Sequence, residues 1–228
     1  MKLEPTRRPV RAVLFDLDGT VLDTAPDMIG ALNQLRTDKG RKHLPYDLLR
    51  PSVSHGSARL VRVGFPDLQE AELPALQQRF LAIYRDNLSG GTALFPGMEG
   101  VLDELAFLRV AVGIVTNKPG WLTQPLLEAL QLSHRFACVV SGDTLAERKP
   151  HPLPLLHAAR LAGTEATDCL YVGDAERDIQ AARAAGMTSL IARYGYIGAQ
   201  DRPAEWLADG DLGAPPDLLP WLRTAGRL

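Results

Sequence analysis

Four short polar segments of this chain carry side chains that could do chemistry, and each follows an apolar stretch. The first segment holds Asp16 and Asp18, with Leu17 between them and Gly19 after them. Because side chains alternate along an extended segment, the two carboxylates point the same way and either repel each other or share a cation. Gly19 permits a sharp exit from the strand. Alone, such a pair is as often a polar turn at the end of a strand.

The second and third segments offer groups that bind anions. Thr116 and Asn117 supply a hydroxyl and a backbone N–H that could bind a phosphate oxygen, although such a pair is usually a turn or helix cap. Lys149 precedes Pro150 and Pro152, which restrict the backbone and so aim its ammonium group. Together the two segments indicate a phosphate-binding site.

The fourth segment adds Asp174 and Asp178, which lie one helical turn apart. Acids at a helix N-terminus are common as caps, so the pair is not specific by itself. With Asp16 and Asp18 at the same rim, however, the carboxylates favour Mg²⁺, a hard cation that prefers oxygen ligands. Such a cation would neutralise the repulsion between an incoming phosphate and a carboxylate nucleophile.

Five apolar stretches predict the strands that position these segments. They are rich in Val, Ile, Leu or Ala and do not alternate with polar residues, which is typical of strands buried on both faces. The five stretches cover residues 10–15, 110–115, 136–140, 169–172 and 188–192.

Helical patterns separate the later stretches. Apolar residues recur at helical spacing over residues 97–109, 122–132, 153–161 and 178–185. Strands and helices that alternate in this way predict an α/β fold, an open parallel sheet with helices on both faces. The four polar segments would then gather at one rim of that sheet.

Residues 23–91 interrupt the alternation. They contain no convincing strand, and amphipathic patterns predict helices over residues 25–37, 57–64 and 71–88. A strand-to-helix loop usually has 2–6 residues, so we interpret this segment as a helical cap inserted after the first strand. The predicted domains are thus a catalytic core of residues 1–22 and 92–228 and a cap of residues 23–91.

In this order, the four segments resemble the motifs of the haloacid dehalogenase-like superfamily. The resemblance implies a Rossmann-like core with an α-helical cap inserted after the first motif. It also implies a phosphatase in which Asp16 attacks phosphorus and carries the phosphoryl group. Asp18 matches the family's acid/base aspartate, which protonates the leaving alkoxide and then activates water.

The resemblance assigns the remaining motif residues as well. Thr116 and the Asn117 backbone match the phosphate-binding motif, and Lys149 matches the charge-balancing lysine. The implied Mg²⁺ ligands are the Asp16 carboxylate, the Asp18 carbonyl and Asp174, while Asp178 matches the second acid of the fourth motif, outside the ligands.

Within the superfamily the chain is most similar to the phosphoglycolate phosphatase group, in residues 15–27, 116–119, 149–152 and 173–186. Its tail, residues 193–209, instead resembles N-acetylmuramic acid 6-phosphate phosphatases of cell-wall recycling. Packing of Tyr194 and Trp206 against the sheet would equally explain those aromatic residues. We expect 2-phosphoglycolate as substrate and keep N-acetylmuramic acid 6-phosphate as the alternative.

Residues 53–59 look like the substrate loop of the cap, with His55, Gly56 and Arg59 as candidate specificity residues. Related proteins tend to carry a second glycine where Ser54 or His55 stands, so this loop departs from the pattern. An exposed loop histidine and a solvated arginine would explain His55 and Arg59 as well as substrate contacts would.

Two further functions stay open. A sugar phosphomutase shares the first chemical steps, and a non-catalytic binding protein could reuse the fold. Asp18 argues against a dehalogenase, because family dehalogenases lack an acid at that place. A binding module has little reason to keep clustered carboxylates that repel each other without a metal.

Composition limits the partners. The chain has 228 residues and a net charge of −2, which gives no reason to expect nucleic acid or an anionic membrane as a partner. The N-terminal segment is charged, and the apolar stretch after it stops at Asp16, too short for a signal peptide or a membrane span, so we expect a cytoplasmic protein. Cys138 and Cys169 lie in apolar stretches without zinc-type spacing and are expected to be buried thiols.

The expected partner is a small phosphorylated metabolite, and a monomer is the default.

Overall fold

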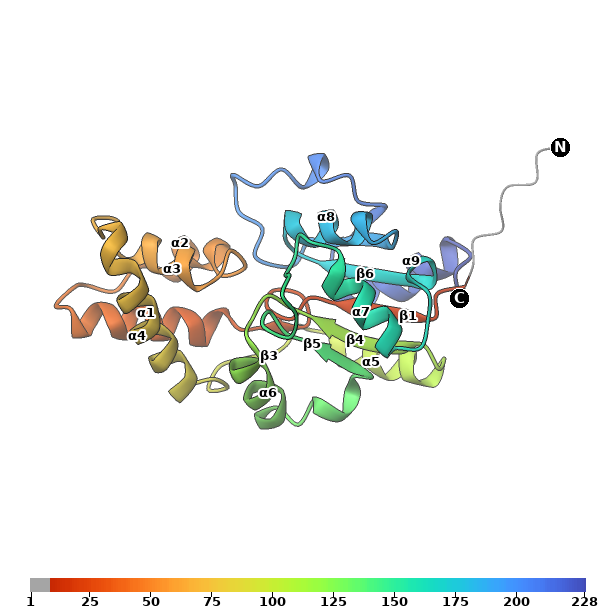
Figure 1. The fold of residues 1–228 in the computed structure, drawn as a ribbon, viewed down its shortest axis with the longest axis horizontal. Helices are drawn as coiled ribbons and strands as arrows, with labels where there is room; N and C mark the ends of the chain where they lie inside the picture. Colours follow the sequence, from red (N-terminus) through yellow and green to blue (C-terminus); the bar gives the residue numbers. More distant parts are fainter. Residues whose placement is uncertain (1–8) are drawn as a thin grey trace.

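The computed structural model describes residues 9–228. Figure 1 shows a central sheet flanked by helices, with a separate group of helices at the end of the molecule opposite the C-terminus. The predicted core and the charged N-terminal segment both include residues 1–8, which lie outside the described residues.

Six parallel strands form the sheet, in the order β5-β4-β1-β6-β7-β8. All of these strands except β8 coincide with the five predicted stretches, which are thereby confirmed. β8 was missed because its sequence, Gly-Asp-Leu, is short and only its leucine is buried. The strands are β1 (Ala12–Phe15), β4 (Ala111–Val115), β5 (Cys138–Val140), β6 (Cys169–Gly173), β7 (Thr188–Ala192) and β8 (Gly210–Leu212).

Helices cover both faces of the sheet, as the continuous apolar strands predict. Side chains alternate along β1, so Leu14 packs in the cluster under α7 and α8, and Phe15 packs in the cluster under α5, α6 and α9. The core helices are α5 (Met98–Phe107), α6 (Gly120–Ala129), α7 (Leu153–Leu161), α8 (Glu176–Ala184) and α9 (Leu218–Thr224).

The helices of the predicted cap pack on one another beside the sheet (Figure 1). Three of them correspond to the predicted helices, whereas α2 is too short to give a periodic pattern. The four are α1 (Ala25–Asp38), α2 (Tyr46–Leu49), α3 (Ser57–Gly64) and α4 (Leu73–Asp86).

A short antiparallel pair, β2 (Leu22–Asp23) and β3 (Ala93–Leu94), joins the two ends of this helical segment. The sequence did not reveal it, because two residues are too few for an alternating pattern. The pair places the chain that enters the helical segment beside the chain that leaves it. The division into a cap of residues 23–91 and a core stays a prediction.

The order of the strands places the ends of β1 and β6 at a special point. The chain runs from β1 to β4 and β5 on one side, and then returns through β6 to β7 and β8 on the other. Open α/β sheets bind ligands beyond the carboxyl ends of the strands where the order reverses in this way. Asp16 directly follows β1, and Asp174 directly follows β6.

Two further sequence expectations concern the cysteines and the membrane. Cys138 and Cys169 are free and buried, as predicted, and burial raises their pKa values to about 11 and about 12, which keeps both thiols protonated at neutral pH. Among residues 9–228, no helix has the length and apolar composition needed to cross a membrane.

A core substitution tests this packing. Leu14 is fully buried at the centre of the sheet. We expect Leu14→Ala to lower the free energy of unfolding by about 2–5 kcal/mol, because the cavity it leaves cannot fully collapse. Urea denaturation measures the change. Phe107→Ala is the control, since Phe107 is 81% exposed and should change stability by less than about 0.5 kcal/mol. Equal losses in both variants would contradict the packing described.

Candidate active site

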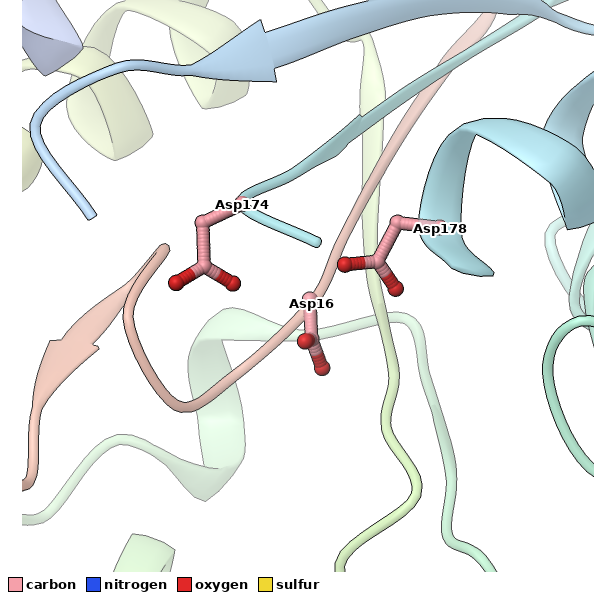
Figure 2. Close-up of side chains that lie close together, drawn as sticks. All are labelled: Asp16, Asp174 and Asp178. Carbon is pink, nitrogen blue, oxygen red and sulfur yellow. The ribbon is translucent and has the colours of Figure 1, made fainter. Parts of the chain in front are cut away.

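Three buried aspartates meet beyond the sheet. Asp16, Asp174 and Asp178, hereafter the carboxylate cluster, each offer an oxygen, and these oxygens lie within 4.8 Å of one another. Figure 2 shows them approaching from the end of β1, the end of β6 and the first turn of α8. Buried carboxylates this close repel one another unless cations lie among them.

Lys149 supplies one such cation. Its ammonium group lies 3.0 Å from Asp16 Oδ1 and 2.7 Å from Asp178 Oδ1, with no exposed side-chain surface. It also donates hydrogen bonds to the Tyr171 hydroxyl, at 2.7 Å, and to the Val115 carbonyl, at 2.8 Å. Lys149 therefore balances part of the cluster's charge, since one ammonium group faces two of the three carboxyl groups.

The two carboxylate oxygens of Asp174 differ in their hydrogen bonds. Its Oδ2 accepts hydrogen bonds from the Ser54 hydroxyl, at 2.5 Å, and from the Tyr196 N–H, at 2.8 Å. Its Oδ1 is buried without a hydrogen-bond partner among the described residues. A buried polar atom left unpaired calls for an ion or water. The cluster, made of oxygen ligands with excess negative charge, therefore fits a divalent cation such as Mg²⁺.

Two glycines let the chain approach Asp174 closely. Gly19 has a φ of +85°, and a Cβ there would lie 2.1 Å from Asp174 Oδ2. A Cβ at Gly195 would lie 2.3 Å from the Cβ of Asp174. Any larger residue at either place would push the carboxylate out of the cluster.

Asp18 is turned toward a different cation. Its Oδ1 accepts hydrogen bonds from the Thr24 hydroxyl, at 2.7 Å, and from the Lys118 ammonium, at 2.9 Å. Lys118 also donates to the Tyr84 hydroxyl of α4, at 2.9 Å. Burial lowers the pKa of Lys118, but attraction to Asp18 and Tyr84 outweighs it and the net pKa is raised, so Lys118 stays charged.

Lys118 and Tyr84 were missed by the sequence interpretation. Lys118 stands next to Asn117, but its position along the chain gave no sign that its side chain would reach Asp18. Tyr84 lies in a predicted amphipathic helix, where an aromatic residue usually packs in a core. Only the placement of α4 over the end of the sheet brings its hydroxyl to this site.

The second and third polar segments are tied together by Asn117. Its side-chain amide donates to the Lys149 carbonyl, at 2.9 Å, and accepts from the Lys149 N–H, at 3.1 Å. Thr116 is buried, and its hydroxyl accepts from the Lys118 N–H at 3.1 Å. The Asn117 side chain thus fixes the position of Lys149, a contact that the sequence did not predict.

A cavity of about 440 Å³ opens over these residues, between the end of the sheet and the cap helices. Asp16, Asp18, Thr116, Asn117 and Lys149 all line it. Its further polar lining consists of the cations Lys118, Arg148 and Arg177 and the side chains of Ser54, His55, Ser57, Gln77 and Tyr84.

The candidate specificity residues lie differently from one another. His55 and Gly56 line the cavity, whereas Arg59 is exposed and is not among the lining residues. The His55 ring lies 3.8 Å from the Asp201 carboxylate, and burial lowers the pKa of His55. Their roles as specificity residues stay predictions.

The aromatic residues of the tail lie near the first motif. The Tyr196 hydroxyl donates to Asp23, at 2.7 Å, and accepts from the Ala25 N–H, at 2.9 Å. The Tyr194 hydroxyl donates to the Thr20 carbonyl at 3.0 Å. These two tyrosines thus bond to the chain where it enters the helical segment, while Trp206 packs with Ile179 and Ile191 as a core residue.

A second cavity, of about 510 Å³, lies within the cap and contains none of the predicted site residues. Its arginines are already paired. Arg41 binds Asp67 through two hydrogen bonds, at 2.6 and 2.7 Å, and Arg79 lies 3.5 Å from Asp38. The predicted catalytic and phosphate-binding residues therefore line the smaller cavity, next to the carboxylate cluster.

Comparisons with a family model and with curated relatives agree on one protein family. The model of the haloacid dehalogenase-like hydrolases matches residues 13–192. A phosphoglycolate phosphatase of Xanthomonas campestris is 49% identical, with 91% of this chain and 94% of that protein covered. An N-acetylmuramic acid 6-phosphate phosphatase of Pseudomonas putida is 36% identical, with 92% and 94% covered.

A solved structure supports the same fold. The crystal structure of a predicted phosphoglycolate phosphatase from Haemophilus somnus has a TM-score of 0.82 and 29% sequence identity, with 93% of this chain and 97% of that chain covered. The match spans both the sheet and the helical segment. The predicted fold class, a Rossmann-like parallel sheet with surrounding helices, is confirmed.

The charge of the cluster predicts a pH dependence in metal-free protein. Burial, and then repulsion from Asp16 and Asp178, raises the pKa of Asp174 from 3.8 to about 7. Between these values the folded state holds a proton that the unfolded state releases. The stability contributed by protonated Asp174 is thus full below pH 3.8 and is lost as pH rises through about 7.

Urea denaturation in EDTA at about pH 5 and about pH 7.5 measures this effect. The free energy of unfolding should fall more over this interval in the wild-type protein than in Asp174→Asn, which cannot titrate. The same fall in both proteins would show that Asp174 is already ionised at pH 5.

Proposed function

Because the chain belongs to the haloacid dehalogenase-like hydrolases, we propose that it is a Mg²⁺-dependent phosphatase whose phospho-aspartate forms on Asp16. Relatives that match nine tenths of the chain are phosphatases by name. One observation carries the mechanism: a buried carboxylate cluster, partly neutralised by Lys149, lies at the floor of a cavity that Asp16 and Asp18 both line.

Asp16 is the proposed nucleophile. Its Oδ1 accepts hydrogen bonds from the Leu17 N–H, at 2.8 Å, and lies 3.0 Å from Lys149, which fixes the carboxylate. The other oxygen has no hydrogen bond to a described residue and is free to attack. An O–P bond then forms to Asp16 as the bond from phosphorus to the leaving alkoxide breaks.

Asp18 is the proposed acid and base. In its protonated form it gives a proton to the leaving alkoxide, and as a carboxylate it takes a proton from the water that attacks the phospho-aspartate. Water then releases inorganic phosphate and restores Asp16. Thr24 and Lys118 both bond to Asp18 Oδ1, which holds the carboxyl group in place and leaves Oδ2 for the proton.

Electrostatic stabilisation makes up the rest of the proposal. Asp16, the Asp18 carbonyl and Asp174 would hold Mg²⁺, with Asp178 bonded to Lys149; the bound cation would offset the charge of the phosphoryl oxygens. Lys149, 3.0 Å from Asp16, would contribute a second positive charge, and the Thr116 hydroxyl and Asn117 N–H would bind phosphoryl oxygens.

The preferred substrate is 2-phosphoglycolate, the substrate that the names of several relatives indicate. One observation favours the second candidate, N-acetylmuramic acid 6-phosphate. A cavity of about 440 Å³ is much larger than a two-carbon acid needs, and Ser57, Gln77 and Tyr84 offer neutral polar groups of the kind that bind sugar hydroxyls. The cytoplasmic location and the monomeric state stay predictions.

The nucleophile is tested by Asp16→Asn. We expect phosphate release to fall by roughly a thousandfold or more, because an amide cannot form the phospho-aspartate. EDTA should abolish activity of the wild-type protein, and added Mg²⁺ should restore it. Asp103→Asn is the matched control, since Asp103 is exposed and pairs with Arg135 on the surface. Full activity of Asp16→Asn would exclude the mechanism.

The substrate is tested by a panel of phosphate esters ranked by kcat/KM. The panel contains 2-phosphoglycolate, N-acetylmuramic acid 6-phosphate and common hexose phosphates. We expect a preference of at least about tenfold for 2-phosphoglycolate, about 1.4 kcal/mol of transition-state binding. A preference for the amino sugar would replace the substrate, an isomeric product without free phosphate would indicate a mutase, and no turnover would indicate a binding protein.

A further inference from the structure

One residue of the substrate loop contacts the carboxylate cluster at two points. Ser54 is buried, and its hydroxyl donates to Asp174 Oδ2 at 2.5 Å. Its backbone carbonyl accepts a hydrogen bond from the guanidinium of Arg177, in the first turn of α8. The helical segment of the predicted cap thus contacts a residue that we propose as a metal ligand.

The hydroxyl of Ser54 fixes the orientation of the Asp174 carboxylate. With Ser54 and the Tyr196 N–H both bonded to Oδ2, the group cannot rotate without losing two hydrogen bonds. Oδ1 is thereby left unpaired beside Asp16 and Asp178. Groups that orient a metal ligand from outside the coordination sphere typically raise metal affinity by 10–100-fold.

A second residue of the same segment contacts the loop that bonds to Asp174. The guanidinium of Arg50 donates to the carbonyls of Gly195, at 3.0 Å, and Tyr194, at 3.3 Å. It also lies over the Tyr196 ring, 4.8 Å from its centre. Residues 50–54 therefore contact both the carboxylate and the loop that carries its second hydrogen-bond donor.

We propose that Ser54 is a positioning residue that couples the placement of the substrate loop to cation binding at Asp174. The proposal rests on the proposed function, because it assumes that the carboxylate cluster binds Mg²⁺. Coupling between two equilibria is reciprocal, so Mg²⁺ should in turn hold the loop against the core. A glycine in place of Ser54 would leave Asp174 Oδ2 bonded to the Tyr196 N–H alone.

Calorimetric titration of Mg²⁺ into the full chain tests the effect on affinity, in the absence of substrate. We expect the Kd of Ser54→Ala to be about tenfold weaker than that of the wild-type protein. Ser52→Ala is the matched control, because Ser52 is also buried and bonds to neither Asp174 nor Arg177; its Kd should be unchanged. Equal Kd values for the wild-type protein and Ser54→Ala would overturn the proposal.

Hydrogen exchange of the wild-type protein tests the reciprocal effect without any variant. Backbone amides of residues 50–56 should exchange several-fold more slowly with saturating Mg²⁺ than in EDTA, and Ser54→Ala should lose this response. Exchange that does not respond to Mg²⁺ would overturn the coupling. If the wild-type protein binds Mg²⁺ and releases phosphate while both tests fail, only the coupling is wrong; if it binds no Mg²⁺, the coupling and the metal dependence fall together.

Discussion

Mutual repulsion among three buried carboxylates is the constraint around which this molecule is arranged. Asp16, Asp174 and Asp178 lie within reach of one shared ion, in a place almost without solvent. Such a cluster is unfavourable unless positive charge and hydrogen bonds hold it together. Lys149 supplies the nearest charge, and the unpaired Oδ1 of Asp174 marks where more is needed. In the proposed mechanism, Mg²⁺ would relieve this repulsion and let a phosphate ester approach Asp16.

The parallel sheet makes the cluster possible, and for that reason much of it could be predicted. Continuous apolar stretches identify buried strands, and the carboxyl ends of parallel strands share one edge. The polar residues after β1, β4 and β6 must therefore meet, whatever lies between them in the sequence. Lys149 could be included among the predicted site residues because flanking prolines are unusual beside a lysine that is merely solvated. The alternating strand and helix patterns fixed the fold class for the same reason.

Contacts that depend on the reach of a side chain across the fold were not predictable. Lys118 reaches Asp18, and Ser54 reaches Asp174 from 120 residues away, but neither residue type is distinctive in its local sequence. Tyr196 was interpreted as part of the tail, yet its N–H bonds to Asp174. The strands β2, β3 and β8 were missed because two or three residues carry no measurable period. These residues are specified by tertiary packing, which a linear pattern does not contain.

The proposed function assigns reaction type and substrate choice to different parts of the chain. The residues proposed as nucleophile, acid and metal ligands follow β1 and β6, whereas the helical segment of residues 23–91 lines the cavity with Ser57, Gln77 and Tyr84. Ser54 belongs to both, since its hydroxyl extends from the predicted substrate loop to Asp174.

The central claim, a phosphoryl group carried on Asp16, is tested most directly by acid quenching during turnover followed by peptide mass spectrometry. The account predicts a peptide that spans Asp16 and carries the mass of one phosphoryl group, which is absent from Asp16→Asn. A phosphoryl group on another residue, or turnover without any labelled peptide, would contradict it.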